Sequence, residues 1–193
     1  PGYKEAELLK EAFSQHIFKM TNQVNILNDE AMTDPLTGLY NRKGFNKKIN
    51  VYDQSDEHSL IAIDIDHFKR INDNFGHETG DAVLIELGKL LKSIARQNDI
   101  VSRFGGEEFI IFLPDCDLSD AEEVAVLIRT LVDEYLFPKS LHITLSSGVA
   151  ALSDCSKDIN QLLHQADLAM YEAKKAGRNR VCVTDKHGFR FFS

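Results

Sequence analysis

Residues 100–113 read IVSRFGGEEFIIFL, and this stretch decides the fold. Two apolar segments, 100–104 and 109–113, flank the paired residues Gly105-Gly106 and Glu107-Glu108. Apolar, β-branched and aromatic runs on either side of two glycines are typical of antiparallel strands joined by a tight turn. The glycines tolerate positive φ angles and also let a bulky ligand approach the backbone. The stretch therefore predicts a β-hairpin that carries two adjacent carboxylates at its exposed turn.

The segments around this hairpin alternate between strand and helix patterns. The predicted strands cover residues 60–65, 142–149 and 180–184, and the predicted helices cover 42–52, 83–94, 119–135 and 159–176. Ser119 and Glu122 form a capping-box pattern at the start of the third helix. An antiparallel hairpin beside strands that are linked by amphipathic helices predicts an α/β fold with one mixed central sheet flanked by helices.

The first 32 residues predict a separate helical extension. Residues 5–31 contain no Gly or Pro, and apolar residues recur three or four apart. The residues of this seam are Phe13, Ile17, Met20, Val24, Leu27 and Ala31. A narrow seam suits either a coiled coil with a partner helix or packing on the helix's own domain. Pro35 and Gly38 then end the helix, which divides the chain into residues 1–32 and a domain of residues 33–193.

The overall composition excludes some classes of protein. A formal net charge of −8 argues against bulk nucleic-acid binding, and 43% hydrophobic residues indicate a globular domain. No apolar run is long enough to span a membrane. Three isolated cysteines, Cys116, Cys155 and Cys182, fit a reducing compartment, so we expect a cytoplasmic domain. The chain begins at Pro1, which is compatible with a longer protein that carries an upstream sensor or a membrane anchor.

The predicted strand 60–65 carries an acidic residue, Asp64, near its C-terminal end. Its side chains alternate between two faces, so Asp64 lies opposite Ile63 and Ile65. A carboxylate at the end of an apolar strand is costly to bury alone, and a divalent cation held between Asp64 and Glu107 would explain both acids. Asp66 has a simpler interpretation, as the N-cap of a helix that begins near His67.

Four blocks of sequence together resemble the GGDEF family of diguanylate cyclases, bacterial enzymes that join two GTP molecules into cyclic di-GMP. They are DPLTGLYNR at 34–42, DIDHFKRINDNFGHETGD at 64–81, GGEEF at 105–109 and YEAKKAGRN at 171–179. The blocks occur in the order found in the family. The resemblance implies a fold similar to the palm of nucleotidyl cyclases and polymerases.

The resemblance also implies a metal centre. Asp64, Glu107 and the Ile65 carbonyl would bind Mg²⁺ or Mn²⁺, which neutralises phosphate charge and activates a 3′-hydroxyl. Glu107 would also take the proton of that hydroxyl. Glu108 would be a further catalytic carboxylate, on the ribose side or behind the metal.

Substrate contacts follow from the same resemblance. Asn72 and Asp81 would read the guanine, because Asp81 offers an acceptor and Asn72 offers both an acceptor and a donor. Lys174 and Arg178, four apart at a helix end, would bind phosphates, although both also suit the dipole at a helix C-terminus. The remaining expected contacts are Phe68, Lys69, His77, Gly105 and Gly106. His77 is equally compatible with a structural role.

The implied reaction needs a homodimer, because one domain holds one GTP and the product contains two. Arg96 and Asp99 form an RxxD pattern at the position of the family's inhibitory product site, although this short pattern also arises by chance. Two other functions remain open. One is an inactive receptor for GTP or cyclic di-GMP, and the other is a nucleotidyltransferase that makes a mixed cyclic dinucleotide.

Overall fold

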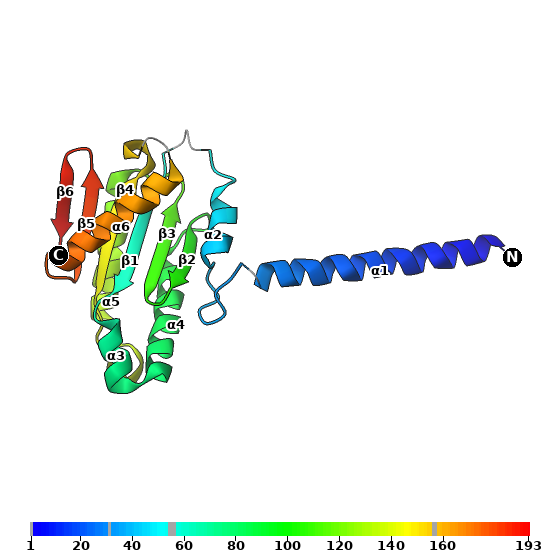
Figure 1. Cartoon of the computed structure of the whole chain (residues 1–193), viewed down its shortest axis with the longest axis horizontal. Helices are drawn as coiled ribbons and strands as arrows, with labels where there is room; N and C mark the ends of the chain where they lie inside the picture. Colours follow the sequence, from blue (N-terminus) through cyan, green and yellow to red (C-terminus); the bar gives the residue numbers. More distant parts are fainter. Residues whose placement is uncertain (1, 31, 54–56, 156–157) are drawn as a thin grey trace.

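The computed structural model describes residues 2–30, 32–53, 57–155 and 158–193. Helix α1 (Gly2–Glu30) extends away from an α/β domain that contains the rest of the chain (Figure 1). Two 3₁₀ turns, Pro138–Ser140 and Leu152–Asp154, precede and follow one of the central strands. The predicted α/β fold with an N-terminal helical extension is confirmed.

One six-stranded sheet forms the centre of the domain, in the order β2-β3-β1-β4-β5-β6. Its strands are β1 (Ser59–Ile65), β2 (Ile100–Gly105), β3 (Glu108–Leu113), β4 (Leu145–Ala151), β5 (Arg180–Asp185) and β6 (Gly188–Phe192). Strands β4 and β5 run parallel, and every other neighbouring pair is antiparallel. The sheet is therefore mixed, and the predicted hairpin of residues 100–113 is its β2–β3 pair.

Helices cover both faces of this sheet. They are α2 (Arg42–Ile49), α3 (Phe68–Phe75), α4 (His77–Ile94), α5 (Leu118–Glu134) and α6 (Ile159–Lys175). Side chains of α2 and α6 form one core with Leu60 and Ala62 of β1. Side chains of α4 and α5 form the other core with Ile61 and Ile63. Because β1 lies between two helical layers, all seven of its residues are buried.

Several element boundaries differ from the prediction. Helix α2 ends at Ile49 rather than at residue 52, and β4 begins at Leu145 rather than at residue 142. Helix α5 begins at Leu118, because the Asp117 side chain accepts a hydrogen bond from the Asp120 N–H and caps it. The N-cap predicted at Ser119 was therefore wrong, because the helix is capped two residues earlier. The last strand, β6, was not predicted at all.

The long helix α1 does not rest on the domain over residues 7–24, whose side chains are all exposed. The seam residues Phe13 and Met20 are 68% and 52% exposed. Packing of this seam on the helix's own domain is thus excluded for these residues, while Leu27 and Ala31 lie outside the described side chains. Among the described residues, no helix combines the length and the hydrophobicity that crossing a membrane requires.

Candidate active site

Asp64 lies at the end of β1, beside the last turn of α6. It is only 5% exposed, and its Oδ2 atom lies 2.9 Å from the Lys174 Nζ atom. Burial raises the pKa of Asp64 and the charge of Asp66 acts in the same direction, while Lys174 opposes the shift. As predicted, Asp64 shares the face of Leu60 and Ala62, opposite Ile63. A buried carboxylate here therefore depends on neighbouring cations.

The β2–β3 turn brings Glu107 to the same place. The Ile65 N–H donates to the Glu107 carbonyl at 3.4 Å, so the turn is joined to the end of β1. Burial raises the pKa of Glu107, and repulsion from Asp64 raises it further. Gly105 and Gly106 have φ angles of 151° and 51°, and a Cβ on either would meet nothing within 4 Å. Conformation, rather than lack of space, therefore requires glycine in this turn.

The Asp64 and Glu107 carboxylates fit a divalent metal ion whose other coordination positions are filled by water or by a bound ligand. In addition to burial, the charge of Asp64 raises the pKa of Glu107, and a cation between the two carboxylates would relieve this repulsion. Within the residues that the structure describes, no three His, Cys, Asp or Glu side chains group to hold a metal. Mg²⁺ characteristically takes one or two carboxylates and leaves its other positions to water and substrate phosphates.

Arg103 was not recognised from the sequence, and it holds the acidic turn in place. Its Nε and Nη2 atoms donate to the Gly106 carbonyl at 3.1 and 2.8 Å. Its Nη1 atom donates to both carboxylate oxygens of Asp34 at 3.0 Å. Although burial acts to raise it, hydrogen bonds from Thr37 and Arg103 hold the pKa of Asp34 below its ordinary value. The segment that follows α1 is thus connected directly to the turn.

The two predicted guanine-reading residues, Asn72 and Asp81, come from α3 and α4, which lie at the end of the sheet where β1 ends (Figure 1). Asn72 is half-buried and Asp81 is exposed. A Cβ built on Gly80 would overlap the Asn72 Oδ1 atom. Gly80 therefore makes room for the Asn72 side chain, a role that sequence reasoning missed.

The other expected substrate contacts on α3 and α4, Phe68, Lys69 and His77, differ in how exposed their side chains are. The Phe68 side chain belongs to the core, so only its backbone remains available to a ligand. Lys69 and His77 are both exposed. His77 is the first residue of α4 and follows Gly76, whose φ angle is 86°. Of the three, only Lys69 and His77 can extend a side chain toward a bound molecule.

Lys174 and Arg178 do not share a helix face, contrary to the prediction. Helix α6 ends at Lys175, and Arg178 follows in a loop with a φ angle of 63°. The charges of both side chains nevertheless lower the pKa of Asp64. The loop therefore brings Arg178 to the same centre that Lys174 reaches from the helix.

Asp66 does not cap α3, and this interpretation was wrong. His67 occupies the N-cap position, with a φ angle of 56° and no capping hydrogen bond from its side chain. Asp66 is instead 5% exposed, and its carboxylate accepts hydrogen bonds from Thr144, Ser146 and the backbone of Asn179. Its partners come from the start of β4, together with the residue before it, and from the loop after α6.

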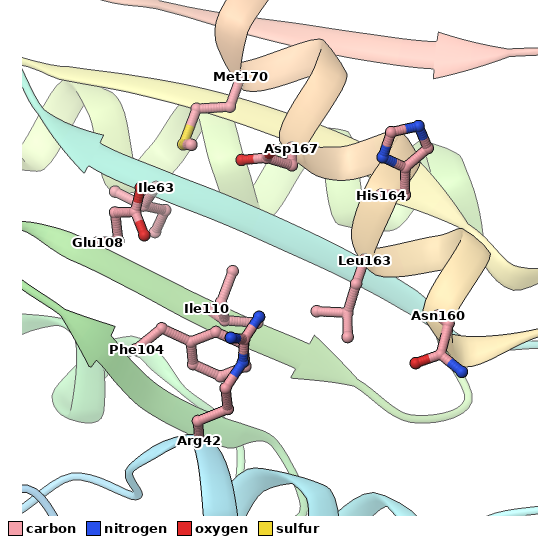
Figure 2. A pocket seen from close by; sticks show the side chains of 10 residues that line it. All are labelled: Arg42, Ile63, Phe104, Glu108, Ile110, Asn160, Leu163, His164, Asp167 and Met170. Carbon is pink, nitrogen blue, oxygen red and sulfur yellow. The ribbon is translucent and has the colours of Figure 1, made fainter.

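A groove of about 380 Å³ opens beside Glu108, on the face that α2 and α6 cover (Figure 2). Its floor is apolar, and its rim carries Arg42 together with Asn160, His164 and Asp167 of α6. The Arg42 guanidinium lies 5.0 Å from the centre of the Phe104 ring. Sequence analysis singled out none of these rim residues, although the three on α6 recur at helical spacing. Glu108 thus lines a groove with an apolar floor and a polar rim, and it pairs across the sheet with Asp64.

Arg96 and Asp99 lie in the turn between α4 and β2, at the end of β2 away from the acidic turn. The Asp99 carboxylate accepts a hydrogen bond from the Arg96 N–H at 2.6 Å. Burial raises the pKa of Asp99. Both residues line a groove of about 400 Å³ that also includes Tyr40 and Lys92. The pair is therefore distinct from the Asp64 centre and leaves the Arg96 side chain exposed.

The fold thus combines a mixed sheet, a buried carboxylate at the end of its central strand and a glycine-rich acidic hairpin beside that strand. Residues 31–180 match the family described as diguanylate cyclase, GGDEF domain. The chain belongs to this family. Members of the family use a divalent metal, which is consistent with the donors around Asp64.

Individual relatives support this assignment. The chain is 35% identical to the probable diguanylate cyclase DgcE of Escherichia coli over 177 residues, which cover 88% of the chain and 16% of the relative. It is 40% identical to the response regulator PleD of Caulobacter vibrioides over 161 residues, which cover 78% of the chain and 36% of PleD. The chain therefore spans well under half the length of these two relatives.

Solved structures show the same fold. The coiled coil and GGDEF domain of DgcB from Caulobacter crescentus, in complex with c-di-GMP, superposes with a TM-score of 0.82 at 28% identity. That match covers 93% of this chain and 98% of the DgcB chain. The active GGEEF domain of a Vibrio cholerae diguanylate cyclase is 40% identical, with a TM-score of 0.64, over 74% of this chain and 90% of that one.

Proposed function

We propose that this domain condenses two GTP molecules into cyclic di-GMP, with release of two pyrophosphates, across the interface of a homodimer. The observation that carries the proposal is the meeting of Asp64, Lys174 and the acidic turn at the end of β1. The guanine-reading pair on α3 and α4 follows β1 directly in the chain. Because GTP is the substrate, the proposal assigns the domain to the cytoplasm.

In this proposal, Asp64, Glu107 and the Ile65 carbonyl hold a Mg²⁺ or Mn²⁺ ion. When bound, the ion neutralises phosphate charge and makes the 3′-hydroxyl of the second GTP more acidic. Lys174 and Arg178 then neutralise the triphosphate. The 3′-oxygen attacks the α-phosphorus, the bond to the β-phosphate breaks, and Glu107 accepts the proton.

Asp81 and Asn72 favour GTP over ATP. A guanine presents N1–H and amino donors, and the exposed Asp81 carboxylate is an acceptor for them. An adenine would leave this carboxylate without a donor, which costs binding free energy. Asn72 supplies both a donor and an acceptor to the same base edge. Reaction with mixed GTP and ATP should therefore yield cyclic di-GMP rather than a mixed product.

Mass spectrometry of the products formed from GTP, ATP and Mg²⁺ tests the proposal. The wild type should make cyclic di-GMP, and a Glu107→Ala variant should make none. The assay needs high protein concentration and an enzyme that removes product, since both dimerisation and inhibition affect the rate. A protein that binds cyclic di-GMP but makes none would instead be a receptor, and a product containing adenine would identify a different nucleotidyltransferase.

We further propose that α1 mediates dimerisation. Phe13, Ile17, Met20 and Val24 form an exposed apolar seam on a helix that extends away from the domain (Figure 1). The alternating spacing of four and three residues is that of a two-stranded coiled coil. The helix leads into Asp34 and thus to Arg103 at the acidic turn. A sensor upstream of this chain would then control the alignment of two domains through α1.

Replacing Ile17 by Asp should break this dimer, because a charge in the seam loses its hydration without gaining a partner. We expect the rate per protomer to fall at least about tenfold at low protein concentration and to recover as concentration rises. Cyclic di-GMP formation measured over a range of protein concentrations checks this. Gln15→Asp is the matched control on the far side of the helix. Equal behaviour of the two variants would contradict a role for the seam.

The Arg96 and Asp99 groove is proposed as the inhibitory product site. An exposed Arg guanidinium can hold a guanine edge or a phosphate with two parallel hydrogen bonds. Tyr40 and Lys92 in the same groove offer an aromatic face and a second positive charge. Cyclic di-GMP bound in this groove would therefore inhibit the enzyme from a site separate from the proposed metal site at Asp64 and Glu107.

An Arg96→Ala variant should synthesise cyclic di-GMP with reduced inhibition by added product. Loss of charge-assisted hydrogen bonds predicts an increase in the inhibition constant of roughly ten- to a hundredfold. Initial rates against added cyclic di-GMP measure it. Gln97→Ala, which removes an uncharged side chain from the same groove, is the control. Unchanged inhibition in Arg96→Ala would remove this site from the proposal.

A further inference from the structure

The loop after α6 has an unusual backbone. Gly177, Arg178 and Asn179 have consecutive positive φ angles of 118°, 63° and 46°. Glycine adopts such angles freely and Asn does so more often than most residues, but Arg adopts them only where the surrounding structure compensates. This loop carries Arg178, one of the two proposed phosphate ligands. Its conformation therefore needs contacts that hold it.

Asp66 provides the first of these contacts from the end of β1. Its Oδ2 atom accepts a hydrogen bond from the Asn179 N–H at 2.9 Å. The Thr144 hydroxyl donates to the same oxygen, and the Ser146 hydroxyl donates to Oδ1, both at 2.6 Å. Three donors from two segments, the start of β4 with the residue before it and the loop after α6, thus converge on one buried carboxylate. Each of these contacts uses the carboxylate as an acceptor.

The Asn179 side chain provides the second contact, to α5. Its Oδ1 atom accepts a hydrogen bond from Arg129 Nη1 at 3.1 Å, and its Nδ2 atom donates to Asp133 at 3.5 Å. Arg129 and Asp133 themselves form an ion pair with an N–O distance of 3.7 Å. The backbone of Asn179 is thus bound to β1 while its side chain is bound to α5. The residue before it, Arg178, keeps an exposed side chain.

We propose that Asp66 and Asn179 are positioning residues, which hold the loop so that the Arg178 guanidinium faces the phosphates of bound GTP. This role rests on the proposed function. Asp66 is two residues from Asp64 on the same strand end, so one short segment determines both the metal centre and the position of Arg178.

The role is tested by a double-mutant cycle between Asp66→Asn and Arg178→Ala. The asparagine keeps the size of Asp66 but brings an NH₂ group against groups that are themselves donors. The measurement is calorimetric binding of a non-hydrolysable GTP analogue with Mg²⁺. We expect each single variant to bind at least about tenfold more weakly, and the double variant to bind no more weakly than Arg178→Ala. Additive losses would overturn the positioning role.

Two further readouts separate positioning from general structural damage. Guanosine, which has no phosphates, should bind to Asp66→Asn as it does to the wild type. Ser59→Ala removes a buried hydrogen bond of 2.8 Å at the opposite end of β1 and should leave analogue binding unchanged. A loss of guanosine binding in Asp66→Asn, or an equal loss of analogue binding in Ser59→Ala, would contradict the proposal.

Asn179→Gly is the second variant, in case Asp66→Asn does not fold. Glycine keeps the left-handed backbone and the N–H that Asp66 binds, but it removes the contact to α5. We expect Asn179→Gly to weaken binding of the analogue in the otherwise wild-type protein. In a protein that already carries Arg178→Ala, adding Asn179→Gly should cause no further loss. A wild type that does not bind the analogue would overturn the proposed function, and the positioning role with it. Wild-type binding with additive losses would overturn the positioning role alone.

Discussion

An Asp64→Asn variant should lose cyclic di-GMP synthesis by at least about 100-fold, because the proposed metal would lose a charged ligand. The amide keeps the size of the side chain, so the strand end and both cores should remain intact. Asn can still accept a hydrogen bond from Lys174, but it cannot offset the charge of a metal or of the ammonium group. The expected loss therefore concerns chemistry and metal binding rather than folding.

The measurement is the initial rate of product formation at several Mg²⁺ concentrations, together with a thermal unfolding curve. Asp73→Asn is a matched control, because it makes the same chemical change on an exposed residue of α3. That variant should retain wild-type activity. Activity of Asp64→Asn within a few-fold of wild type, with a normal unfolding curve, would refute the assignment of Asp64 to the metal centre.

A Gly148→Ala variant should show the largest loss of stability. Gly148 is in β4, where α6 crosses the sheet, and an added Cβ would overlap the backbone atoms Ala166 O and Met170 N. Backbone atoms of a helix cannot move aside as a side chain can, so α6 would have to shift. Overpacking of this kind costs about 3 kcal/mol or more of the free energy of unfolding. For a domain of this size the melting temperature should fall by roughly 6–12 °C.

Chemical and thermal unfolding measure this loss, and Gly88→Ala in α4 is the control. A Cβ at Gly88 would come no closer than 3.4 Å to side-chain atoms of Leu39 and Thr37, and alanine favours a helix interior over glycine. Gly88→Ala should therefore be neutral or slightly stabilising. If Gly148→Ala were as stable as the wild type, the close packing of α6 on β4 would be wrong. Since α6 carries Lys174, the variant should also bind GTP more weakly.

Much of the fold could be predicted because the relevant signals are local. Alternation along β1 assigned Asp64 to the face opposite Ile63, and the paired glycines marked the turn of the hairpin. Helix boundaries were less certain because neighbouring residues compete for the same role. Asp117 and Ser119 can both cap a helix, and Asp117 does so here. Strand β6 was missed although it pairs with β5 across a turn of only two residues, because its side chains are mostly exposed and no buried apolar face marks it as part of the sheet.

Some residues of the candidate site could likewise be predicted from local sequence, whereas others became visible only in the structure. Sequence motifs identified Asp64, Asn72 and Asp81, because their residue types and their spacing belong to short continuous segments. The structure added Arg103, whose partner Asp34 is 69 residues away in the chain. It also added Gly80, whose role is visible only once α3 and α4 pack together.

Asp66 shows most clearly where local sequence stops being informative. An acid just before a helix has the same local pattern whether it caps that helix or turns into the core. Here its three partners are 78, 80 and 113 residues away, and they meet at one carboxylate only because β4 and α6 pack beside β1. The sequence determined which chemical groups the domain carries and which strand ends in acid. Only the folded chain, in which a buried carboxylate needs hydrogen-bond donors, decided that Asp66 binds the backbone of the loop that carries Arg178.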